Sequence, residues 1–403
     1  MNEREQYIGQ RLREIRKWRR LSLTAVAELS GISIGHLSKI ERGQRPISKR
    51  STLEMLAQVL RVSPEELTGT PYAPVDPLSS EAHAALAAVE TALDAHDLGV
   101  DPGVALRPWQ ELRAAVRDLY EGKWAEADFA AQGAILPELL AELHAAYVRD
   151  PEHRPAVLAG LIYAYRSVAG VAKFLGARAL PPLAALRAQI CAEELDSPEW
   201  MGFAAFIRGF AGSLSQPHQY SQAVRAAERV QDALNGSNAI QVAGALHLNA
   251  ALISAAQENP DQARDHLAEA IALARRLPAA RDNFGYLHFG PEHVGVWQVS
   301  LGVELGEGAK VAEYVRVPPE IFPGKARQAA FYADLGRGLI AERKTMQRGI
   351  QALAQAERIA PQLIRNNPFV REAVTNLLMT TRRDAGGREL RGLAYRMGVA
   401  PTV

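Results

Sequence analysis

The sequence predicts an all-α protein in which a small N-terminal domain of five helices is followed by a much larger array of helices. Aromatic residues make up only 6% of the chain, and the dominance of Ala and Leu favours helix over sheet. Apolar residues recur every three to four positions, and no segment beyond residue 80 alternates convincingly with period two. A chain of 403 residues also exceeds the size at which one core usually stays undivided, so two or more domains are expected.

Charge is distributed unevenly between the two parts. Residues 1–70 contain 13 Lys and Arg against 8 Asp and Glu, whereas the remainder contains 33 against 37. A basic domain attached to an acidic one predicts a polyanionic partner for the first part alone. The single cysteine, Cys191, suits a reducing compartment. With no apolar N-terminal leader and no run of about 18 apolar residues, we expect a cytoplasmic protein with no membrane partner.

Apolar residues at helical spacing predict the first four helices of the N-terminal domain. They are Ile8, Leu12, Ile15 and Trp18; Val26, Ala27 and Leu29; Leu37 and Ile40; and Leu53, Leu56, Ala57 and Leu60. The segment "SPEEL" predicts the fifth, because Ser63 can cap it, Pro64 suits its first position and Glu66 completes a capping box. The domain is thus expected over residues 1–69. A Pro-rich linker over 70–80 follows, within "GTPYAPVDPLSS".

Residues 81–403 are predicted to form paired helices. Three helix starts are marked by a capping side chain before Pro, in "DSPEW" (196–200), "ENPDQA" (258–263) and "NNPFV" (366–370). Small residues within turn-then-helix stretches, Ala223, Ala263 and Ala309, are separated by 40 and 46 positions. This spacing predicts stacked helix pairs of roughly 40 residues each, an α-solenoid.

The segment "GISIGHLSKIERGQR" (31–45) carries the clearest functional signal. Gly31 suits a tight turn that ends one helix, Ala27 is small enough for two helices to cross, and Ser33 can cap the next helix. This is the geometry of a helix-turn-helix, whose second helix enters the DNA major groove. Residues 8–68 resemble the lambda-repressor/Cro-like helix-turn-helix family, often called XRE, through its "G-[IV]-S…IE-x-G" pattern. The resemblance covers about 60 of the 403 residues.

The resemblance implies a role for each exposed residue of this segment. Base contacts are implied for Ile34, Gly35, His36 and Lys39, and phosphate contacts for Ser33, Ser38, Arg42, Arg45 and Lys49. Glu41 is expected to make an internal bond, because phosphate repels a carboxylate. Leu23 departs from the family, in which many members have a Gln there that holds phosphate. Members usually bind a palindromic double-stranded operator as homodimers, with half-sites about 34 Å apart.

The helical array also has a family resemblance. "LYEGKWAEADFAA" (119–131) and "ENPDQARDHLAEAIALA" (258–274) resemble the second helix of tetratricopeptide repeats. The combination of the two domains resembles peptide-sensing regulators of Gram-positive bacteria. It also resembles pathway-linked regulators of actinobacteria, in which "FGPEHVGVWQVSLGVELG" (289–306) resembles a recurring segment. A peptide or small-molecule effector in a concave groove is therefore implied.

Polar and aromatic residues on otherwise apolar helices are candidates to line that groove. The candidates are Tyr163, Arg166, Phe206, Arg208, His247, Asn249, His293 and Trp297, with Arg337 as a further one. The alternative is that these side chains pack between helices or satisfy local backbone groups.

The sequence offers no enzyme signature. "GRGLIA" (336–341) mimics a dinucleotide-binding fingerprint but lies in a helical pattern, and no H-E-x-x-H, paired cysteines or P-loop occurs. We therefore expect a transcription regulator without cofactor or metal, whose DNA affinity is controlled by a peptide or small metabolite. Two alternatives stay open. The array could serve only for oligomerisation or protein docking, or the helix-turn-helix could belong to a scaffold without specific DNA binding.

Overall fold

The computed structural model describes residues 7–68, 77–177, 179–212, 214, 217–231, 236–278, 282–316, 318–380 and 387–399. These residues form helices and connecting segments without a strand, which confirms the all-α prediction. The N-terminal domain contains the five expected helices. They are α1 (Ile8–Trp18), α2 (Leu23–Ser30), α3 (Ile34–Glu41), α4 (Arg50–Leu60) and α5 (Pro64–Thr68).

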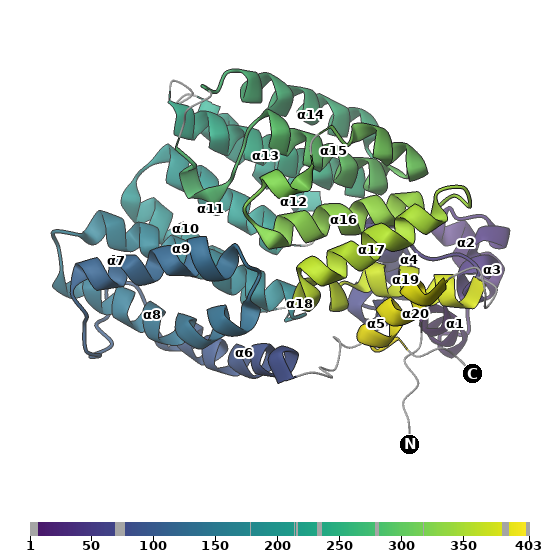
Figure 1. The fold of residues 1–403 in the computed structure, drawn as a ribbon, viewed down its shortest axis with the longest axis horizontal. Coiled ribbons are helices and arrows are strands. Elements are labelled where there is room, and N and C mark those ends of the chain that lie inside the picture. The colour runs from purple at the N-terminus through teal and green to yellow at the C-terminus, as the bar shows by residue number, and fades with distance from the viewer. Residues whose placement is uncertain are drawn as a thin grey trace.

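The remaining helices form one continuous array in which most consecutive helices pack side by side (Figure 1). Its α-helices are α6 (Pro77–Ala95), α7 (Trp109–Arg117), α8 (Phe129–Arg149), α9 (Arg154–Phe174), α10 (Leu180–Leu195), α11 (Pro198–Ala211), α12 (Pro217–Gln231), α13 (Ser237–Ala256), α14 (Pro260–Arg275), α15 (Pro291–Leu305), α16 (Lys325–Leu339), α17 (Met346–Ile359), α18 (Pro361–Arg365), α19 (Pro368–Thr380) and α20 (Gly387–Arg396). A π-helical segment, η1 (Asp118–Trp124), follows α7, and three short 3-10 segments are η2 (Phe284–Tyr286), η3 (Gly308–Tyr314) and η4 (Pro319–Ile321).

The core of the N-terminal domain is built from the apolar positions that the spacing predicts. Leu12, Leu37 and Leu56 are fully buried. Trp18 and Leu29 belong to the same apolar patterns but lie outside the core, with side chains that are 76% and 66% exposed. Trp18 lies at the last position of α1, where its ring packs under the Arg19 guanidinium instead of entering the core.

The predicted helix starts are confirmed by their hydrogen bonds. Ser63 accepts from the Glu66 amide at 3.2 Å and Glu66 accepts from the Ser63 amide at 3.3 Å, which is the expected capping box. Ser197 caps α11, and Asn259 caps α14. Asn367 caps α19 through the amides of residues 369 and 370. In these three helices Pro occupies the first helical position, where its missing N–H costs nothing.

Two expectations about the array are wrong, and one falls outside the described residues. The segment 119–131 is not one helix, because the chain leaves η1, turns at Ala127 with positive φ and starts α8 at Phe129. The stretch around Ala309 is the short 3-10 segment η3. The linker over 70–80 lies mostly outside the described residues, and α6 begins within it at Pro77. Assignment of the array to tetratricopeptide repeats stays a prediction.

The array closes on itself, so that its last helices pack against its first ones (Figure 1). Ile350, Leu353 and Ile364 share a buried cluster with Phe129 and Val171. The Phe129 amide donates to Oε1 of Gln362 at 2.9 Å, and the Lys325 amide donates to the Ala125 carbonyl at 2.6 Å. The closed array encloses a central cavity, into which the N-terminal domain also contributes side chains.

Among the described residues, α9 and α13 are long and apolar enough to cross a membrane. Their apolar windows are 72% and 89% buried within the structure. Both helices therefore have the burial expected of the core of this array.

Candidate DNA-binding face and central cavity

The turn between α2 and α3 has the geometry that the sequence predicts. Gly31 adopts φ of 65°, which a residue with a Cβ rarely adopts, and ends α2. Ser33 then caps α3 by accepting from the His36 amide at 3.3 Å. The buried side chains of Leu37 and Ile40 hold α3 against the domain core. These contacts turn the opposite face of α3 outward, and α2 and α3 form the outer edge of the molecule (Figure 1).

The residues with implied base contacts lie on this outward face. The Ile34 side chain is 46% exposed, and Lys39 is also exposed. A Cβ built on Gly35 would meet nothing within 4 Å, so the backbone there is open to approach. His36 is half-buried, and its pKa is lowered by burial and then by the nearby charges of Arg45 and Lys39. The face therefore carries a local excess of positive charge.

The residues with implied phosphate contacts surround α3 but differ in accessibility. Ser33, Arg42 and Arg45 are exposed, whereas Ser38 is half-buried. Lys49 is also half-buried, because its side chain lies against Gly306 of the array. The accessible members can thus reach a phosphate without rearrangement, and their DNA contacts stay predictions.

Glu41 makes the internal bond that was expected of it. Its two carboxylate oxygens accept from Nε and Nη2 of Arg16 at 2.6 and 2.8 Å, and both side chains are nearly buried. Arg16 also donates to the Leu21 carbonyl at 3.0 Å, which ties the end of α1 to the start of α2. Leu23 packs against the domain core and provides no polar group to a phosphate.

The other side of the N-terminal domain is docked onto the array through an extensive polar contact, which we call the docking interface. It joins Ile8, Gly43, Ser48, Arg50 and Ser51 to Glu258, Glu304, Arg337, Phe369, Glu372 and Asn376. Asn376 donates to the Gly43 carbonyl at 2.6 Å, directly after α3 ends. Phe369 of α19 is part of the buried core of the N-terminal domain. The position of α3 is therefore fixed relative to the array.

Glu304 is the charged centre of the docking interface. It accepts from the Arg50 amide at 3.1 Å and from the Arg50 guanidinium at 3.2 Å, and it lies 3.7 Å from Nη2 of Arg337. Arg337 also pairs with Asp334 and donates to the Ser48 carbonyl. Arg337 was expected to line the effector groove, and that expectation is wrong. Its guanidinium is used in docking, because the N-terminal domain lies over this part of α16.

The raised pKa of Glu372 predicts that the strength of docking depends on pH. Burial raises its pKa from 4.5 to about 7, although backbone hydrogen bonds from Ile8 and Ile47 oppose this shift. A raised carboxyl pKa stabilises the fold below pH 4.5, and the stabilisation is lost as pH rises to about 7. We expect docking to weaken over this range by on the order of 3 kcal/mol. Hydrogen exchange at residues 8–12 should rise with pH after correction for the intrinsic rate, and Glu372→Gln should abolish the excess rise. An equal rise in both proteins would contradict the assignment.

The central cavity has a volume of about 2590 Å³. That exceeds the roughly 300–1,000 Å³ of most small-molecule pockets. Of the eight residues predicted to line an effector groove, six lie in its wall: Arg166, Phe206, Arg208, Asn249, His293 and Trp297. Asn249 also donates to the Phe206 carbonyl at 3.3 Å, and Arg208 donates to Gln189 at 2.9 Å. Effector binding by these residues stays a prediction.

The other two candidates do not line the cavity. Tyr163 packs within a cluster of aromatic rings, 4.9 Å from the ring of Tyr120 and against Phe203. His247 faces α14, where its Nδ1 lies 3.0 Å from Nδ1 of His266. Both side chains are therefore used in packing between helices, which is the alternative that the sequence left open.

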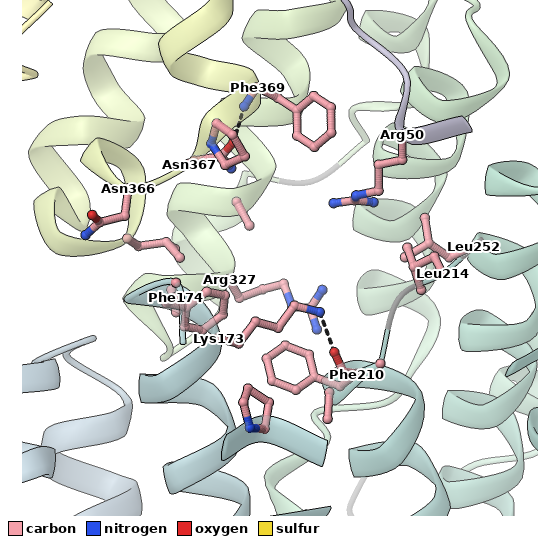
Figure 2. Close-up of a pocket in the computed structure, with 18 of the residues that line it drawn as sticks. Arg50, Lys173, Phe174, Phe210, Leu214, Leu252, Arg327, Asn366, Asn367 and Phe369 are labelled. Carbon is pink, nitrogen blue, oxygen red and sulfur yellow. Dashed lines mark hydrogen bonds between the residues drawn. The ribbon is translucent and has the colours of Figure 1, made fainter. Parts of the chain in front are cut away.

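Sequence reasoning missed three cations of the cavity wall, Arg50, Lys173 and Arg327. Figure 2 shows their side chains extending into the same space from α4, α9 and α16. A lysine near the end of a helix and an arginine in a first turn look like ordinary solvated side chains in the sequence. Only the closure of the array and the docking of the N-terminal domain bring them together.

Helix α15 contacts both functional regions. His293 and Trp297, near its first turn, line the cavity, and Glu304, in its last turn, holds the docking interface. The same helix lies in the segment 289–306, whose resemblance to a segment of actinobacterial regulators stays a prediction.

Comparisons with known proteins agree with the geometry of the N-terminal domain. Residues 8–68 match the model of a helix-turn-helix domain. The uncharacterized HTH-type transcriptional regulator RghRB of Bacillus subtilis (strain 168) is 48% identical over 60 residues, which are 15% of this chain and 43% of that protein. The HTH-type transcriptional repressor RghR of the same organism is 37% identical over 60 residues, 15% of this chain and 44% of the repressor. The chain thus matches less than half the length of these relatives. No solved structure matches it.

Proposed function

We propose that this chain is a transcriptional regulator that binds a palindromic operator as a homodimer and whose DNA affinity is controlled by an effector in the central cavity. The observation that carries the proposal is the placement of α3. Its face with Ile34, Gly35 and Lys39 is open, while the rest of the domain is held by the array. The resemblance of residues 8–68 to helix-turn-helix regulators supports the same function.

Control by an effector is supported by the composition of the cavity wall. Tyr7, Ile8 and Arg50 of the N-terminal domain line the cavity together with residues of the array. A ligand there contacts both parts, so it can bind differently to docked and displaced arrangements of the domain. In a dimer, such a displacement changes the distance between the two α3 helices. A coupling of about 1–3 kcal/mol, typical of allostery, corresponds to about 5- to 150-fold control of operator affinity.

Alanine substitutions on the open face test DNA binding directly. We expect Lys39→Ala and Arg42→Ala each to weaken binding to a promoter fragment, because each removes a cation that can neutralise phosphate or donate to a base. Each loss should reduce the slope of log affinity against log salt concentration by about 1. Fluorescence anisotropy over a range of salt concentrations measures both quantities.

Arg275→Ala provides the matched control, since Arg275 is an exposed cation on α14, a helix of the array outside the helix-turn-helix domain. This variant should bind as the unsubstituted protein does. If Lys39→Ala and Arg42→Ala also bind unchanged, α3 is not the DNA-reading helix. A protein that shows no preference for its own promoter would instead favour the scaffold alternative.

A second candidate function is an array that serves only for oligomerisation or protein docking. Thermal denaturation with candidate peptides and metabolites separates it from the sensor, because a cavity ligand must raise the unfolding midpoint.

Analytical ultracentrifugation with intact and half-site-disrupted operator fragments tests the homodimer independently. A monomer bound equally well to both fragments would overturn that part of the proposal.

A further inference from the structure

The cavity wall holds cations that are not paired with a carboxylate of the described residues. Among the described residues, Arg166, Lys173 and Arg327 form no ion pair. Lys173 donates to the Phe210 carbonyl and Arg166 to the Gly285 carbonyl, and the Arg327 guanidinium lies 5.2 Å from the centre of the Trp297 ring. Burial lowers the pKa of Lys173 to about 7, with Arg50 contributing. Burial also lowers the pKa of Arg327 to about 10, with Arg166 contributing and Asp334 partly opposing the shift. No carboxylate of the described residues therefore lies within ion-pair distance of these three cations, and Asp334, which acts on Arg327 from a distance, is itself paired with Arg337.

Three carboxylates also line the cavity, Glu54, Glu121 and Glu372, and none of them forms an ion pair with these cations among the described residues. Glu121 accepts from the Tyr286 hydroxyl at 3.0 Å, and Glu372 accepts from the Ile8 amide at 3.2 Å. Arg50 is paired with Glu304 but is still partly exposed, and its guanidinium points toward Lys173 and Arg327 (Figure 2). Cations without counter-ions in a partly buried site are costly unless an anion joins them.

The rest of the wall around these cations is apolar. Phe174, Phe210, Leu214 and Leu252 surround the same space (Figure 2). Two side chains next to Arg327 have buried polar atoms without a hydrogen-bond partner among the described residues, Nδ1 of His293 and Nε1 of Trp297. Their rings are 6.4 Å apart and both line the cavity. The site thus offers charge, hydrogen-bond capacity and apolar surface within one enclosure.

We infer that the central cavity binds an organic anion, with a carboxylate at Lys173 and Arg327 and an apolar body against Phe210, Leu214 and Leu252. A carboxylate satisfies this chemistry because it accepts charge-assisted hydrogen bonds from both cations. Two kinds of ligand have a carboxylate attached to an apolar body: an amphipathic small-molecule acid and the C-terminus of an apolar peptide. The inference rests on the proposed function, of which it specifies the effector class.

A matched pair of probes tests the requirement for charge. 1-Pyrenebutyrate and 1-pyrenebutanol have the same aromatic body and differ in the carboxylate. Titrating each into the full-length protein while following pyrene fluorescence gives the two dissociation constants. We expect the carboxylate to bind at least about tenfold more tightly, since charge-assisted hydrogen bonds in a desolvated site are the strong ones. Equal affinities would overturn the inference.

Substitutions in the wall locate the bound carboxylate. Lys173→Met and Arg327→Met should each weaken 1-pyrenebutyrate binding by about tenfold and leave 1-pyrenebutanol binding unchanged. Arg327→Lys keeps the charge and should retain most of the affinity, which separates lost charge from lost folding. Arg275→Met removes an exposed cation on α14 and should have no effect. Full carboxylate affinity in both cavity variants would place the anion elsewhere and overturn the assignment.

Two further arms identify the source of the carboxylate. Apolar pentapeptides with a free C-terminus are compared with their C-terminal amides, and dodecanoate is compared with dodecanol, each by displacement of 1-pyrenebutyrate. A preference for the free acid in the first pair supports a peptide effector, and in the second pair a small-molecule acid. No preference in either pair would overturn the inference.

The test is independent of DNA binding. Lys39→Ala should weaken operator binding and leave 1-pyrenebutyrate binding intact. Loss of operator recognition in every experiment, with the anion still bound at Lys173 and Arg327, would contradict the proposed function alone. Operator recognition without anion binding would contradict only the present inference.

Discussion

Replacing Glu304 with alanine is expected to release the helix-turn-helix domain from the helical array. The substitution leaves the Arg50 amide and guanidinium without their acceptor, and it leaves the buried Arg337 with Asp334 as its remaining carboxylate. Breaking a buried ion pair by removing one partner costs about 3–5 kcal/mol, because the other charge stays desolvated. Hydrogen exchange of peptides spanning residues 43–51 and 368–380 should show a matching loss of protection.

Glu292→Ala is the matched control, since Glu292 is an exposed carboxylate in the first turn of the same helix. It should leave protection at the docking interface unchanged. If Glu304→Ala also leaves protection unchanged, the remaining contacts of the docking interface hold the domain and the charged centre is dispensable.

Replacing Glu41 with alanine is expected to unfold the N-terminal domain locally while the array keeps its structure. Glu41 accepts two hydrogen bonds from Arg16, whose other nitrogen fixes the chain at Leu21. Losing a buried, bidentate partner costs about 3–5 kcal/mol, a large share of the stability of a domain this small. Hydrogen exchange in α1 and α3 should accelerate, and operator affinity should fall with it.

Glu28→Ala removes an exposed carboxylate from the neighbouring helix α2 and should change neither quantity. Glu41→Gln keeps one acceptor oxygen, so its effect on hydrogen exchange and operator affinity should lie between those of Glu28→Ala and Glu41→Ala. Loss of operator affinity in Glu41→Ala with unchanged exchange in α1 would instead mean that the carboxylate acts at the DNA.

The features that the sequence predicts correctly are determined within a few residues. The turn at Gly31 and the caps at Ser33, Ser197 and Asn259 depend on the conformation of one residue and on side chains that bond to amides two or three positions away. Apolar periodicity then identifies most of the core. It fails at Trp18 because the periodic pattern cannot show where the helix ends relative to the packed surface.

The docking interface could not be predicted, because it joins residues that are far apart along the chain. Arg50 and Glu304 are 254 positions apart, and Ile8 and Glu372 are 364 apart. One signal was available for α19. Glu372 and the half-buried Asn376 follow Phe369 at helical spacing, on a helix whose buried positions other than Glu372 are apolar. Polar residues on such a face indicate a polar partner but do not identify it.

The lining of the cavity could be predicted only in part. Side chains such as Arg166, His293 and Trp297 stand out on apolar helices, and they do line it. Tyr163 stands out in the same way but packs between helices. The spacing of residues on one helix shows that a side chain is unusual for its face, and only the packing of neighbouring helices shows whether a hollow lies beside it.

Helix α15 directly connects the central cavity to the docking interface. His293 and Glu304 are eleven positions apart along the helix, which is about 16 Å at 1.5 Å per residue. Because valines are buried along its length, a shift of this helix at the cavity end can be passed to its other end through packed contacts. Under the proposed function, no chain of rearranging loops is required between an effector in the cavity and the domain proposed to read DNA.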